Sequence, residues 1–480
     1  MAGQTAYGAG LDRSVKPVPR PSGFRAETTQ GAEALIAKAR LRGDVSFVVA
    51  NARTGRILET HNPLLALPPA SVAKSMTTQY ALETLGPAYA FTTRIVATAP
   101  MVDGKIDGDL ILVGGGDPTL DTNALAELAA ALKSTGLYEV TGRFLVSSGS
   151  LPHINQIDAD QPEHLGYNPA VSGLNLNYNR VHFEWKRARD AYTVTMDARS
   201  EKYRPEVGVA RMKIADRAGP TYTYSNGGGT ENWTVARGAL GTGGSRWLPV
   251  RQPELYAGEV FGIFARSNGI VLKSAELAPP GARGVLIVER KSQPLQYILR
   301  GMLKYSNNLT AEVSGMSASV ARGKSITTLE DSGAEMSRWM RGRLGAKNPH
   351  FVDHSGLGDD TRITSSDLVQ SLIRIGPDST LATIMKDVPV HDDKGNLRKA
   401  SDVSVRAKTG TLNFVSGLGG YISVGAKTRL AFAIFAADIP RREALPIEQR
   451  ERPPGAKGWN SQAKKLQYQL INRWSALYRA

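Results

Sequence analysis

The sequence predicts an α+β protein whose antiparallel sheet is assembled from both ends of the chain and flanked by helices. Strand-like runs occur near the start and again after about residue 400, and helical patterns dominate the stretch before this second group. Strands with an apolar face need partners and a helical cover, so the two groups are expected to share one sheet. A β-rich stretch at residues 91–283 interrupts this pattern and predicts an insertion. The 480 residues leave room for roughly two to four domains.

The first unit is predicted to be a helix followed by a hairpin. Residues 1–24 are rich in glycine, proline and basic residues and are predicted to be a disordered lead. A helical pattern then runs from Gly31 to Arg42. Ser46 to Ala50 and Arg56 to His61 are predicted strands around the turn sequence Arg53-Thr54-Gly55.

The next helix places a serine and a lysine together. Pro68-Pro69 holds the backbone extended and pre-sets a first helical turn, and the helical pattern continues from Ser71 to Leu85. Ser71 is therefore expected at a helix N-terminus, where the dipole favours developing negative charge. Lys74 is three residues further on, so the two side chains share one face. This arrangement offers a hydroxyl nucleophile beside an amine base.

The same Ser-x-x-Lys spacing occurs a second time, at Ser461 and Lys464. There the serine opens an amphipathic pattern that predicts a terminal helix from about Ser461. Ser461 is interpreted as an ordinary residue of the helix N-cap region. The spacing alone therefore does not identify a catalytic serine.

The insertion is predicted to hold short strands separated by tight turns. Its two triple glycines, at residues 114–116 and 227–229, are interpreted as turns because neither precedes the Gly-Lys-Ser/Thr of a phosphate loop. Two helices are expected, at Thr122 to Ser134 and Pro253 to Ser267. The predicted strands are Arg94 to Ala97, Asp109 to Val113, Arg143 to Ser147, Val181 to Trp185 and Tyr192 to Met196.

After the insertion the helical pattern returns, and the chain closes with strands and the terminal helix. The predicted helices are Pro294 to Leu303, Ser306 to Ala321, Thr327 to Leu344 and Ser365 to Ile375. The predicted strands are Gly284 to Glu289, Val403 to Ala407, Gly420 to Val424 and Arg429 to Ala437.

Three short motifs follow one another along the chain: Ser71-x-x-Lys74, Ser306-Asn307-Asn308 and Lys408-Thr409-Gly410. In this order they resemble the penicillin-recognising serine enzymes. The 231 residues between the first and second motifs resemble the low-molecular-mass class C penicillin-binding proteins, which are D-alanyl-D-alanine carboxypeptidase/endopeptidases. The resemblance covers roughly residues 24–438. It includes Gly108 to Thr119, Ser172 to Arg180, Asp353 to Leu357 and Val415 to Tyr421.

The resemblance implies a penicillin-binding transpeptidase-like fold, which is also the fold of serine β-lactamases. The peptidase domain would be discontinuous, formed by residues 25–90 and 284–480. The β-rich region inserted between the first and second motifs, residues 91–283, would form one or two domains, with two nested subdomains as the expectation.

The resemblance also implies an acyl-enzyme mechanism. Ser71 would attack the carbonyl between two D-alanines, and Lys74 would take its proton. Burial and the positive charge of Lys408 are the expected means of lowering the pKa of Lys74. Ser306 would relay a proton to the leaving amine, and Asn308 would hold the substrate backbone.

The remaining implied positions bind the substrate. Lys408 and Thr409 would bind its terminal carboxylate. Gly410 would let the substrate strand lie close to the protein. The backbone N–H groups of Ser71 and Thr411 would form the oxyanion hole.

Recognition of the substrate's third residue departs from the family pattern. The family often uses an arginine just after Ser-Gly-Leu, together with an aspartate of the inserted domain. This chain has Asp359 in the arginine's place, so Arg362 is predicted to reach the substrate carboxylate from a shifted position. The sequence does not choose among the acidic residues in the relevant part of the insertion, which are Asp158, Asp160 and Glu163.

Two other functions stay open from the sequence. Tyr305-Ser306-Asn307 also fits the Tyr-x-Asn motif of class C β-lactamases, although the long insertion argues against that register. A class A β-lactamase needs a deacylating glutamate, and neither Glu330 nor Glu335 has the expected Glu-x-x-Leu-Asn context. The alternatives to a peptidase are therefore a serine β-lactamase and a non-catalytic cell-wall-binding protein on the same fold.

Charge and composition narrow the expected partners. Lys and Arg outnumber Asp and Glu by 59 to 44, which gives a net charge of +15 and favours peripheral contact with an anionic wall or membrane. Basic residues are not interleaved with aromatic ones, so nucleic acid is not an expected partner. Cysteine is absent and the histidines lack metal-ligand spacing, so no metal or other cofactor is expected.

The resemblance implies peptidoglycan stem peptides and β-lactam antibiotics as ligands. It also implies a periplasmic or otherwise extracytoplasmic location. Residues 1–24 show no apolar core of a signal peptide, so either an export signal has been removed or the protein stays inside the cell.

Overall fold

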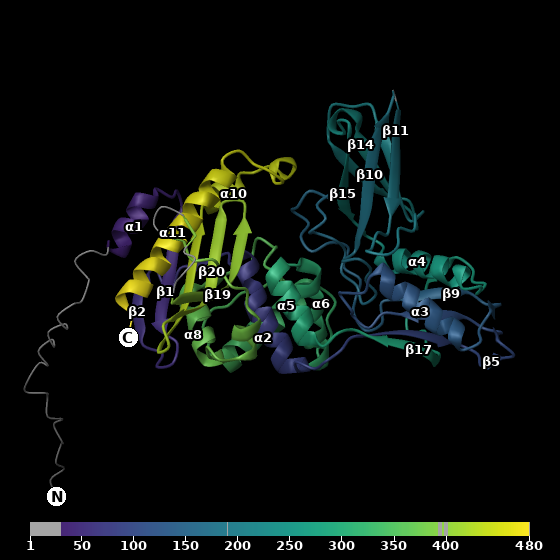
Figure 1. Ribbon diagram of the computed structural model, residues 1–480, viewed down its shortest axis with the longest axis horizontal. Coiled ribbons are helices and arrows are strands. Elements are labelled where there is room, and N and C mark those ends of the chain that lie inside the picture. Colours follow the sequence, from purple (N-terminus) through teal and green to yellow (C-terminus); the bar gives the residue numbers. More distant parts are fainter. Residues whose placement is uncertain (1–29, 190, 392–395, 398–401, 480) are drawn as a thin grey trace, which may run out of the picture.

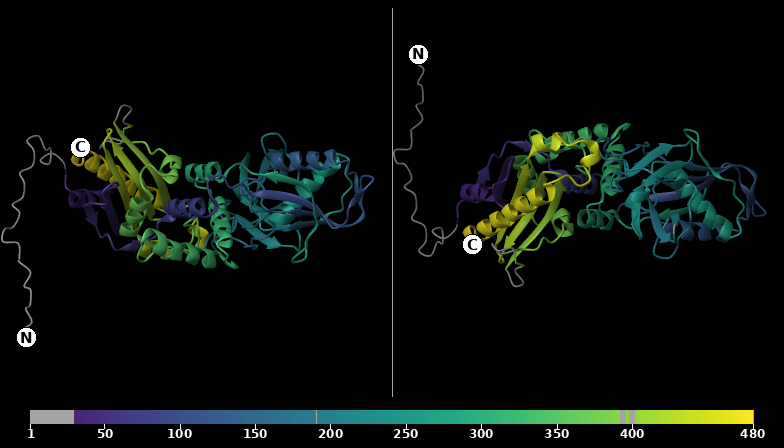
Figure 2. Two further views of the ribbon diagram at one scale, coloured as in Figure 1. Left: turned by 90° about the horizontal axis from the view of Figure 1, so that it is seen from below. Right: turned by 90° about the horizontal axis from the view of Figure 1, so that it is seen from above.

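The computed structural model describes residues 30–189, 191–391, 396–397 and 402–479 (Figure 1). The predicted disordered lead, residues 1–24, lies outside the described residues. The molecule is elongated, with a helix-covered sheet at one end and the inserted region at the other (Figure 2). No helix among the described residues is long and apolar enough to cross a membrane.

The central sheet is assembled from both ends of the chain. Its five strands run in the order β19-β20-β21-β1-β2, and every neighbouring pair is antiparallel. The strands are β1 (Asp44–Asn51), β2 (Ile57–His61), β19 (Val403–Leu412), β20 (Val415–Val424) and β21 (Thr428–Ala437). The predicted joining of first and last strands in one sheet is therefore confirmed.

Helices cover both faces of this sheet because its strands are apolar on both faces. On β1, Phe47 and Val49 belong to the core under α11 (Ala456–Leu477). The alternate residues Val48 and Ala50 belong to the core on the opposite face. That face is covered by α2 (Ala73–Leu85) and α8 (Ser365–Ile375), and α1 (Ala32–Ala39) packs on α11. The remaining α-helices outside the inserted region are α5 (Leu295–Tyr305), α6 (Asn308–Ala321), α7 (Leu329–Trp339), α9 (Thr380–Ile384) and α10 (Ile439–Glu443).

The terminal helix begins earlier than the sequence predicted. Gly455, at φ 80°, precedes the first helical residue, Ala456. Ser461 therefore lies inside the helix, and its hydroxyl donates to the carbonyl of Lys457 (2.9 Å). The interpretation of Ser461 as an N-cap region residue is wrong, because the buried Trp459 extends the apolar face of the helix toward its N-terminus.

The predicted helix over Thr327 to Leu344 consists of two parts. The first is α7, which starts at a capping box formed by Thr328 and Asp331. The second is a π-helical stretch, Met340–Leu344, which ends at Gly345 in the left-handed region. Leu344 is buried, so the last turn still contributes to the core.

The inserted region contains one five-stranded and several smaller sheets. Helices α3 (Thr122–Ser134) and α4 (Pro253–Ser267) have the predicted bounds. The five-stranded sheet has the order β16-β9-β7-β4-β17, and three three-stranded sheets have the orders β11-β10-β15, β12-β14-β13 and β5-β6-β8. The strands of the inserted region are β4 (Thr92–Ala97), β5 (Met101–Val102), β6 (Lys105–Ile106), β7 (Leu110–Val113), β8 (Glu139–Val140), β9 (Phe144–Ser147), β10 (Arg180–Ala188), β11 (Ala191–Asp197), β12 (Ala210–Ala215), β13 (Tyr222–Asn226), β14 (Glu231–Ala236), β15 (Gly243–Pro249), β16 (Ala275–Leu277) and β17 (Val285–Lys291).

The pairing of β17 bears on where the insertion ends. This strand lies after the boundary predicted at residue 283, yet it pairs antiparallel with β4 over most of its length. We therefore propose that the insertion extends to Lys291. One cluster of buried side chains spans the sheets on both sides of α4, including Leu112, Phe183 and Trp233. Division into two nested subdomains stays a prediction.

Candidate active site

The three sequence motifs meet where β19, the edge strand of the central sheet, faces the start of α2 and the turn between α5 and α6 (Figure 1). Ser71, Ser306, Asn308 and Thr411 line one cavity of about 300 Å³. The motifs are separated by 231 and 99 residues along the chain. The structure thus gathers residues of the first two motifs, and the residue that follows the third, around one pocket.

Ser71 lies in a short 3-10 turn, Ala70–Val72, that leads directly into α2. N–H groups in such a first turn have no acceptor within the helix, which suits a site that receives negative charge. The turn packs tightly on β19: a Cβ at Gly410 would lie 2.4 Å from the carbonyl oxygen of Pro69. Glycine is therefore required at residue 410 to let β19 approach the Ser71 turn, a reason that differs from the predicted one of admitting substrate.

The amine of Lys74 is fully buried and makes three hydrogen bonds. It donates to the Ser71 hydroxyl, to Oδ1 of Asn308 and to the backbone carbonyl of Ser355, each at 2.8 Å. Burial lowers the pKa of Lys74 to about 8, although the nearby carboxyl groups of Glu312 and Asp353 oppose this shift. An amine of this pKa is neutral in about a tenth of molecules at pH 7, so it can accept the proton of Ser71.

Glu312 is a site residue that the sequence reasoning missed. Its carboxyl group is buried and accepts from the backbone N–H groups of His354 and Ser355, both at 2.9 Å. Since the carbonyl of Ser355 receives Lys74, Glu312 holds the loop that positions the amine. Burial, with the neighbouring Asp353, raises the pKa of Glu312 to about 8. The available signal was its place four residues after Asn308, on the same face of α6.

The rate of Ser71 acylation is expected to rise with pH and to level off above about pH 8. The reason is that only neutral Lys74 can take the proton of Ser71, and its pKa is about 8. Replacing Glu312 by Gln removes a carboxyl group that raises this pKa, so the rising limb is expected to move to lower pH. Acylation rates measured between pH 5.5 and 9.5 check both statements. Glu330→Gln, on the exposed side of α7, is the matched control, and an unmoved limb in Glu312→Gln would contradict the expectation.

Ser306 and Lys408 form the second half of the site. Ser306 ends α5 in the left-handed conformation (φ 59°), and Asn307 caps α6 by accepting from the N–H of Thr310 (2.9 Å). This sharp turn directs Ser306 and Asn308 toward the pocket. The amine of Lys408 donates to the Ser306 hydroxyl (2.9 Å) and to the carbonyl of Thr409 (2.7 Å).

The charge on Lys408 is poorly stabilised without an anion. Burial first, then the neighbouring amines of Lys74 and Lys386, lower its pKa well below the usual value. An arriving carboxylate would reverse this by pairing with the amine. The expected influence of Lys408 on the pKa of Lys74 is small beside that of burial and of the two carboxyl groups.

Lys408→Gln is expected to lower kcat/KM for a peptide with a free terminal carboxylate about 100-fold. A loss of this size is typical when one partner of a buried, hydrogen-bonded charge pair is removed. A peptide with an amidated end offers no such partner, so its slow hydrolysis should fall less, only by what the loss of the Lys408 to Ser306 hydrogen bond costs. Steady-state kinetics with the two peptides measures the difference. Lys427→Gln, in the exposed turn between β20 and β21, serves as the control. Equal losses for both peptides would rule out the carboxylate role.

The structure does not bring Arg362 into this pocket. Its guanidinium donates to the backbone carbonyls of Asp359 and Thr361. Arg442 and Arg450 line the pocket instead, and both face the carboxylate of Asp359, with Arg442 Nε at 3.0 Å. Recognition by Arg362 stays a prediction, and the two C-terminal arginines are the cations that the sequence reasoning missed.

Two of the three acidic candidates of the insertion support the pocket. Asp160 accepts from Arg450, which lines the cavity, through its backbone carbonyl (2.8 Å). Asp158 accepts from the side-chain amide of Gln161 (2.8 Å), which lines the cavity. Tyr167, from the same loop, accepts a hydrogen bond from Asn308 through its backbone carbonyl (2.9 Å). The insertion therefore forms one wall of the pocket.

The model of the D-Ala-D-Ala carboxypeptidase 3 (S13) family matches residues 29–451. A D-alanyl-D-alanine carboxypeptidase of Actinomadura sp. (strain R39) is 28% identical over 450 residues, covering 85% of this chain and 80% of the relative. D-alanyl-D-alanine carboxypeptidase DacB of Haemophilus influenzae is 21% identical over 439 residues, covering 85% of this chain and 90% of the relative.

Solved structures show the same fold. The crystal structure of penicillin binding protein 4 (dacB) from Haemophilus influenzae matches with a TM-score of 0.74 at 19% identity, covering 94% of this chain and all of that one. The same protein complexed with a novel β-lactam matches with a TM-score of 0.75 at 18% identity and the same coverage. The predicted penicillin-binding fold with an inserted region is therefore confirmed.

Proposed function

The chain belongs to the D-Ala-D-Ala carboxypeptidase 3 (S13) family, and from this premise we propose that it hydrolyses peptidoglycan stem peptides through an acyl-enzyme on Ser71. The bond cleaved is the peptide bond after a D-alanine, either before a terminal D-alanine or in a cross-link. The observation that carries the proposal is the 2.8 Å contact between the Ser71 hydroxyl and the buried amine of Lys74.

Acylation starts when neutral Lys74 accepts the proton of Ser71. The Ser71 oxygen then forms a bond to the substrate carbonyl carbon, and the carbonyl oxygen becomes negative. The N–H groups of Ser71 and Thr411 would stabilise that charge. The C–N bond breaks as the leaving nitrogen receives a proton, which passes from Lys74 through Ser306. The role of Ser306 in this proton transfer is supported by its hydrogen bond from Lys408 (2.9 Å), which fixes the Ser306 hydroxyl.

Hydrolysis of the ester needs a water molecule and a base. Lys74, again neutral after giving up its proton, can remove a proton from water and return it to Ser71 as the ester breaks. No glutamate dedicated to this step is offered by α7. Glu335 is held by Arg322 (3.1 Å) and Arg338 (2.8 Å), and Glu330 lies on the exposed side of the helix. Slow release of penicillin, as in a peptidase, is therefore favoured over β-lactamase turnover.

Substrate ends and β-lactams share a carboxylate near the scissile amide. Lys408 and Thr409 are proposed to bind it, and Asn308 to bind the backbone of the acyl strand. The Haemophilus influenzae relative has been solved with a β-lactam. The net charge of +15 favours a place beside anionic wall or membrane surfaces, and we place the protein outside the cytoplasm, in a periplasm or its equivalent.

The test is incubation with a fluorescent penicillin, followed by peptide mapping of the labelled protein. Label on the peptide that contains Ser71, released over many minutes, supports the proposal. Rapid turnover of penicillin without a lasting adduct would identify a β-lactamase. Absence of label together with no cleavage of a D-Ala-D-Ala peptide would leave a non-catalytic binding protein.

A further inference from the structure

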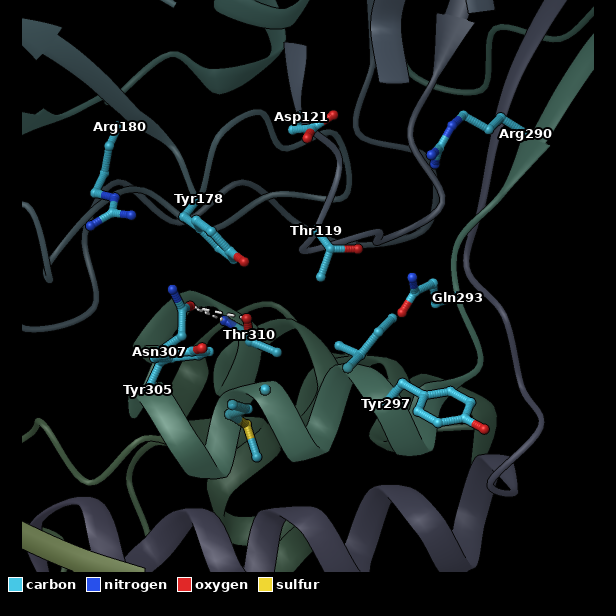
Figure 3. A pocket seen from close by; sticks show the side chains of 13 residues that line it. Thr119, Asp121, Tyr178, Arg180, Arg290, Gln293, Tyr297, Tyr305, Asn307 and Thr310 are labelled. Carbon is cyan, nitrogen blue, oxygen red and sulfur yellow. Dashed lines mark hydrogen bonds between the residues drawn. The ribbon is translucent and has the colours of Figure 1, made fainter. Parts of the chain in front are cut away.

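A second and larger cavity lies beside the active site, between α5 and the inserted region (Figure 3). Its volume is about 610 Å³. A smaller pocket of about 120 Å³ connects it to the catalytic one. The connecting pocket shares Tyr167, Ser306 and Asn308 with the catalytic pocket, and Tyr178, Arg180, Tyr305 and Asn307 with the larger cavity. The three cavities thus adjoin one another. We name the part formed by the connecting pocket and the larger cavity the distal groove.

We propose that the distal groove binds the second peptide strand of a cross-linked substrate, the strand that carries the leaving amine, and that Arg180 binds one of its carboxylates. This inference rests on the proposed function. It adds a binding site for one class of substrate, the anionic peptide attached on the leaving side.

Arg180 is the residue that indicates an anionic ligand. Its guanidinium lies 5.4 Å from the ring centres of both Tyr178 and Trp247, and it forms no ion pair with an acidic side chain among the described residues. Its Nε atom is buried without a hydrogen-bond partner. Arg290, at the far end of the groove, differs because Asp117 and Glu127 lie 3.8 Å from it. An unpaired, half-buried guanidinium is stabilised when a carboxylate binds to it.

The loop beside Arg180 holds Tyr178 in a strained conformation. Asn177, Tyr178 and Asn179 all have left-handed φ values, of 51°, 58° and 52°. Buried hydrogen bonds maintain the strain: Asn177 donates to the Thr122 hydroxyl (2.9 Å), and Asn179 donates to the carbonyl of Ala170 (2.9 Å). Consecutive residues of this kind are costly and concentrate at functional sites. The result is a Tyr178 ring directed into the groove above α6 (Figure 3).

The position of the groove identifies which side of the substrate it receives. The leaving residue is proposed to place its carboxylate at Lys408, which is bonded to Ser306 (2.9 Å). The groove starts at Ser306, so it continues from the leaving side. A single D-alanine would end there, whereas the second strand of a cross-link would extend onward past Tyr305, whose side chain is 74% exposed. Uncharged sugar rings would leave Arg180 unpaired, so the observations favour a peptide that carries carboxylates.

The test compares two sugar-free substrates: a cross-linked peptide dimer and a monomeric peptide that ends in D-Ala-D-Ala. In Arg180→Gln, the ratio of kcat/KM for the dimer to kcat/KM for the monomer is expected to fall about tenfold, and Arg180→Lys should recover part of it. Arg187→Gln, at the exposed end of the same strand β10, should leave the ratio unchanged. Tyr297→Ala, on the exposed face of α5, supplies a second groove variant that is not buried, and it should lower the same ratio.

The outcomes separate this inference from the proposed function. An unchanged ratio in both Arg180→Gln and Tyr297→Ala overturns the inference while hydrolysis of the monomer still supports the proposed function. A third substrate, the same dimer with its sugars attached, tests the other occupant: a fall that appears only with this substrate also overturns the inference, because the occupant would then be a glycan. A wild-type protein that cleaves neither peptide and takes up no penicillin overturns the proposed function itself.

Discussion

Ser71→Ala is expected to abolish penicillin labelling and to lower peptide hydrolysis by about 10⁴-fold or more. The hydroxyl is the atom that forms the acyl bond, and removal of a nucleophile of this kind leaves only the contribution of binding and of the oxyanion hole. The fold should persist, because the hydroxyl's hydrogen bond to Lys74 is the contact that is lost. Rapid-mixing measurement of acylation and a thermal unfolding curve check the two statements.

The chain itself offers the matched control for this substitution. Ser461 has the same Ser-x-x-Lys spacing, but it lies inside α11 and bonds the carbonyl of Lys457. Ser461→Ala is therefore expected to label with penicillin at the wild-type rate. Label that persists in Ser71→Ala, or that disappears in Ser461→Ala, would place the nucleophile elsewhere.

The sequence was sufficient where structure depends on neighbours along the chain. The Pro68-Pro69 start and the Gly86 end of the Ser71 helix were predictable because both are local backbone effects. The same holds for α3, whose N-cap is Asp121. The helix predicted from Ser306 begins at Asn308 instead, because Ser306 caps α5 in the left-handed conformation. Assembly of the sheet from both chain ends was also predictable, since the strands at each end had apolar faces to bury.

The sequence was insufficient where a residue's role depends on a partner far along the chain. Glu312 contacts a loop more than forty residues later, and its spacing from Asn308 does not by itself show that it is buried beside Lys74. Arg442 pairs with Asp359 across 83 residues. Pairing of β17 with β4 was missed for the same reason. The residue pattern of 284–291 predicts a short strand but does not indicate which strand it pairs with.

The environment of Lys74 could be predicted only in part. Burial was expected to lower its pKa, and burial is the largest cause. The two buried carboxyl groups that oppose it, Glu312 and Asp353, were not expected. Burial alone would lower the pKa of the Lys74 amine further. The two carboxyl groups therefore keep this pKa near 8, close to the pH at which the amine must act as a base.

Lys74→Met is the second variant with a large expected effect. Methionine has nearly the same shape, so the cavity stays filled, but no base remains to accept the proton of Ser71. Acylation is expected to slow by about 10³- to 10⁴-fold, the upper range for loss of a general base. Stopped-flow or quenched-flow labelling measures this rate. Acylation within tenfold of wild type would show that another group is the base.

The stability of Lys74→Met should depend on pH in a way that identifies the buried charges. The amine lowers the pKa of Glu312, which burial has raised to about 8, so its loss raises that pKa further. A carboxyl group whose pKa is higher in the folded than in the unfolded protein stabilises the fold at low pH, and this stability is lost as pH rises through the folded pKa. In wild type the loss runs from about pH 4.5 to 8, and in the variant it continues to higher pH.

The thermal midpoint of the variant, relative to wild type, is therefore expected to fall between pH 6 and pH 9. Lys74→Met with the added change Glu312→Gln should lose much of this dependence, and a double variant that keeps the full fall would mean that Glu312 is not its source.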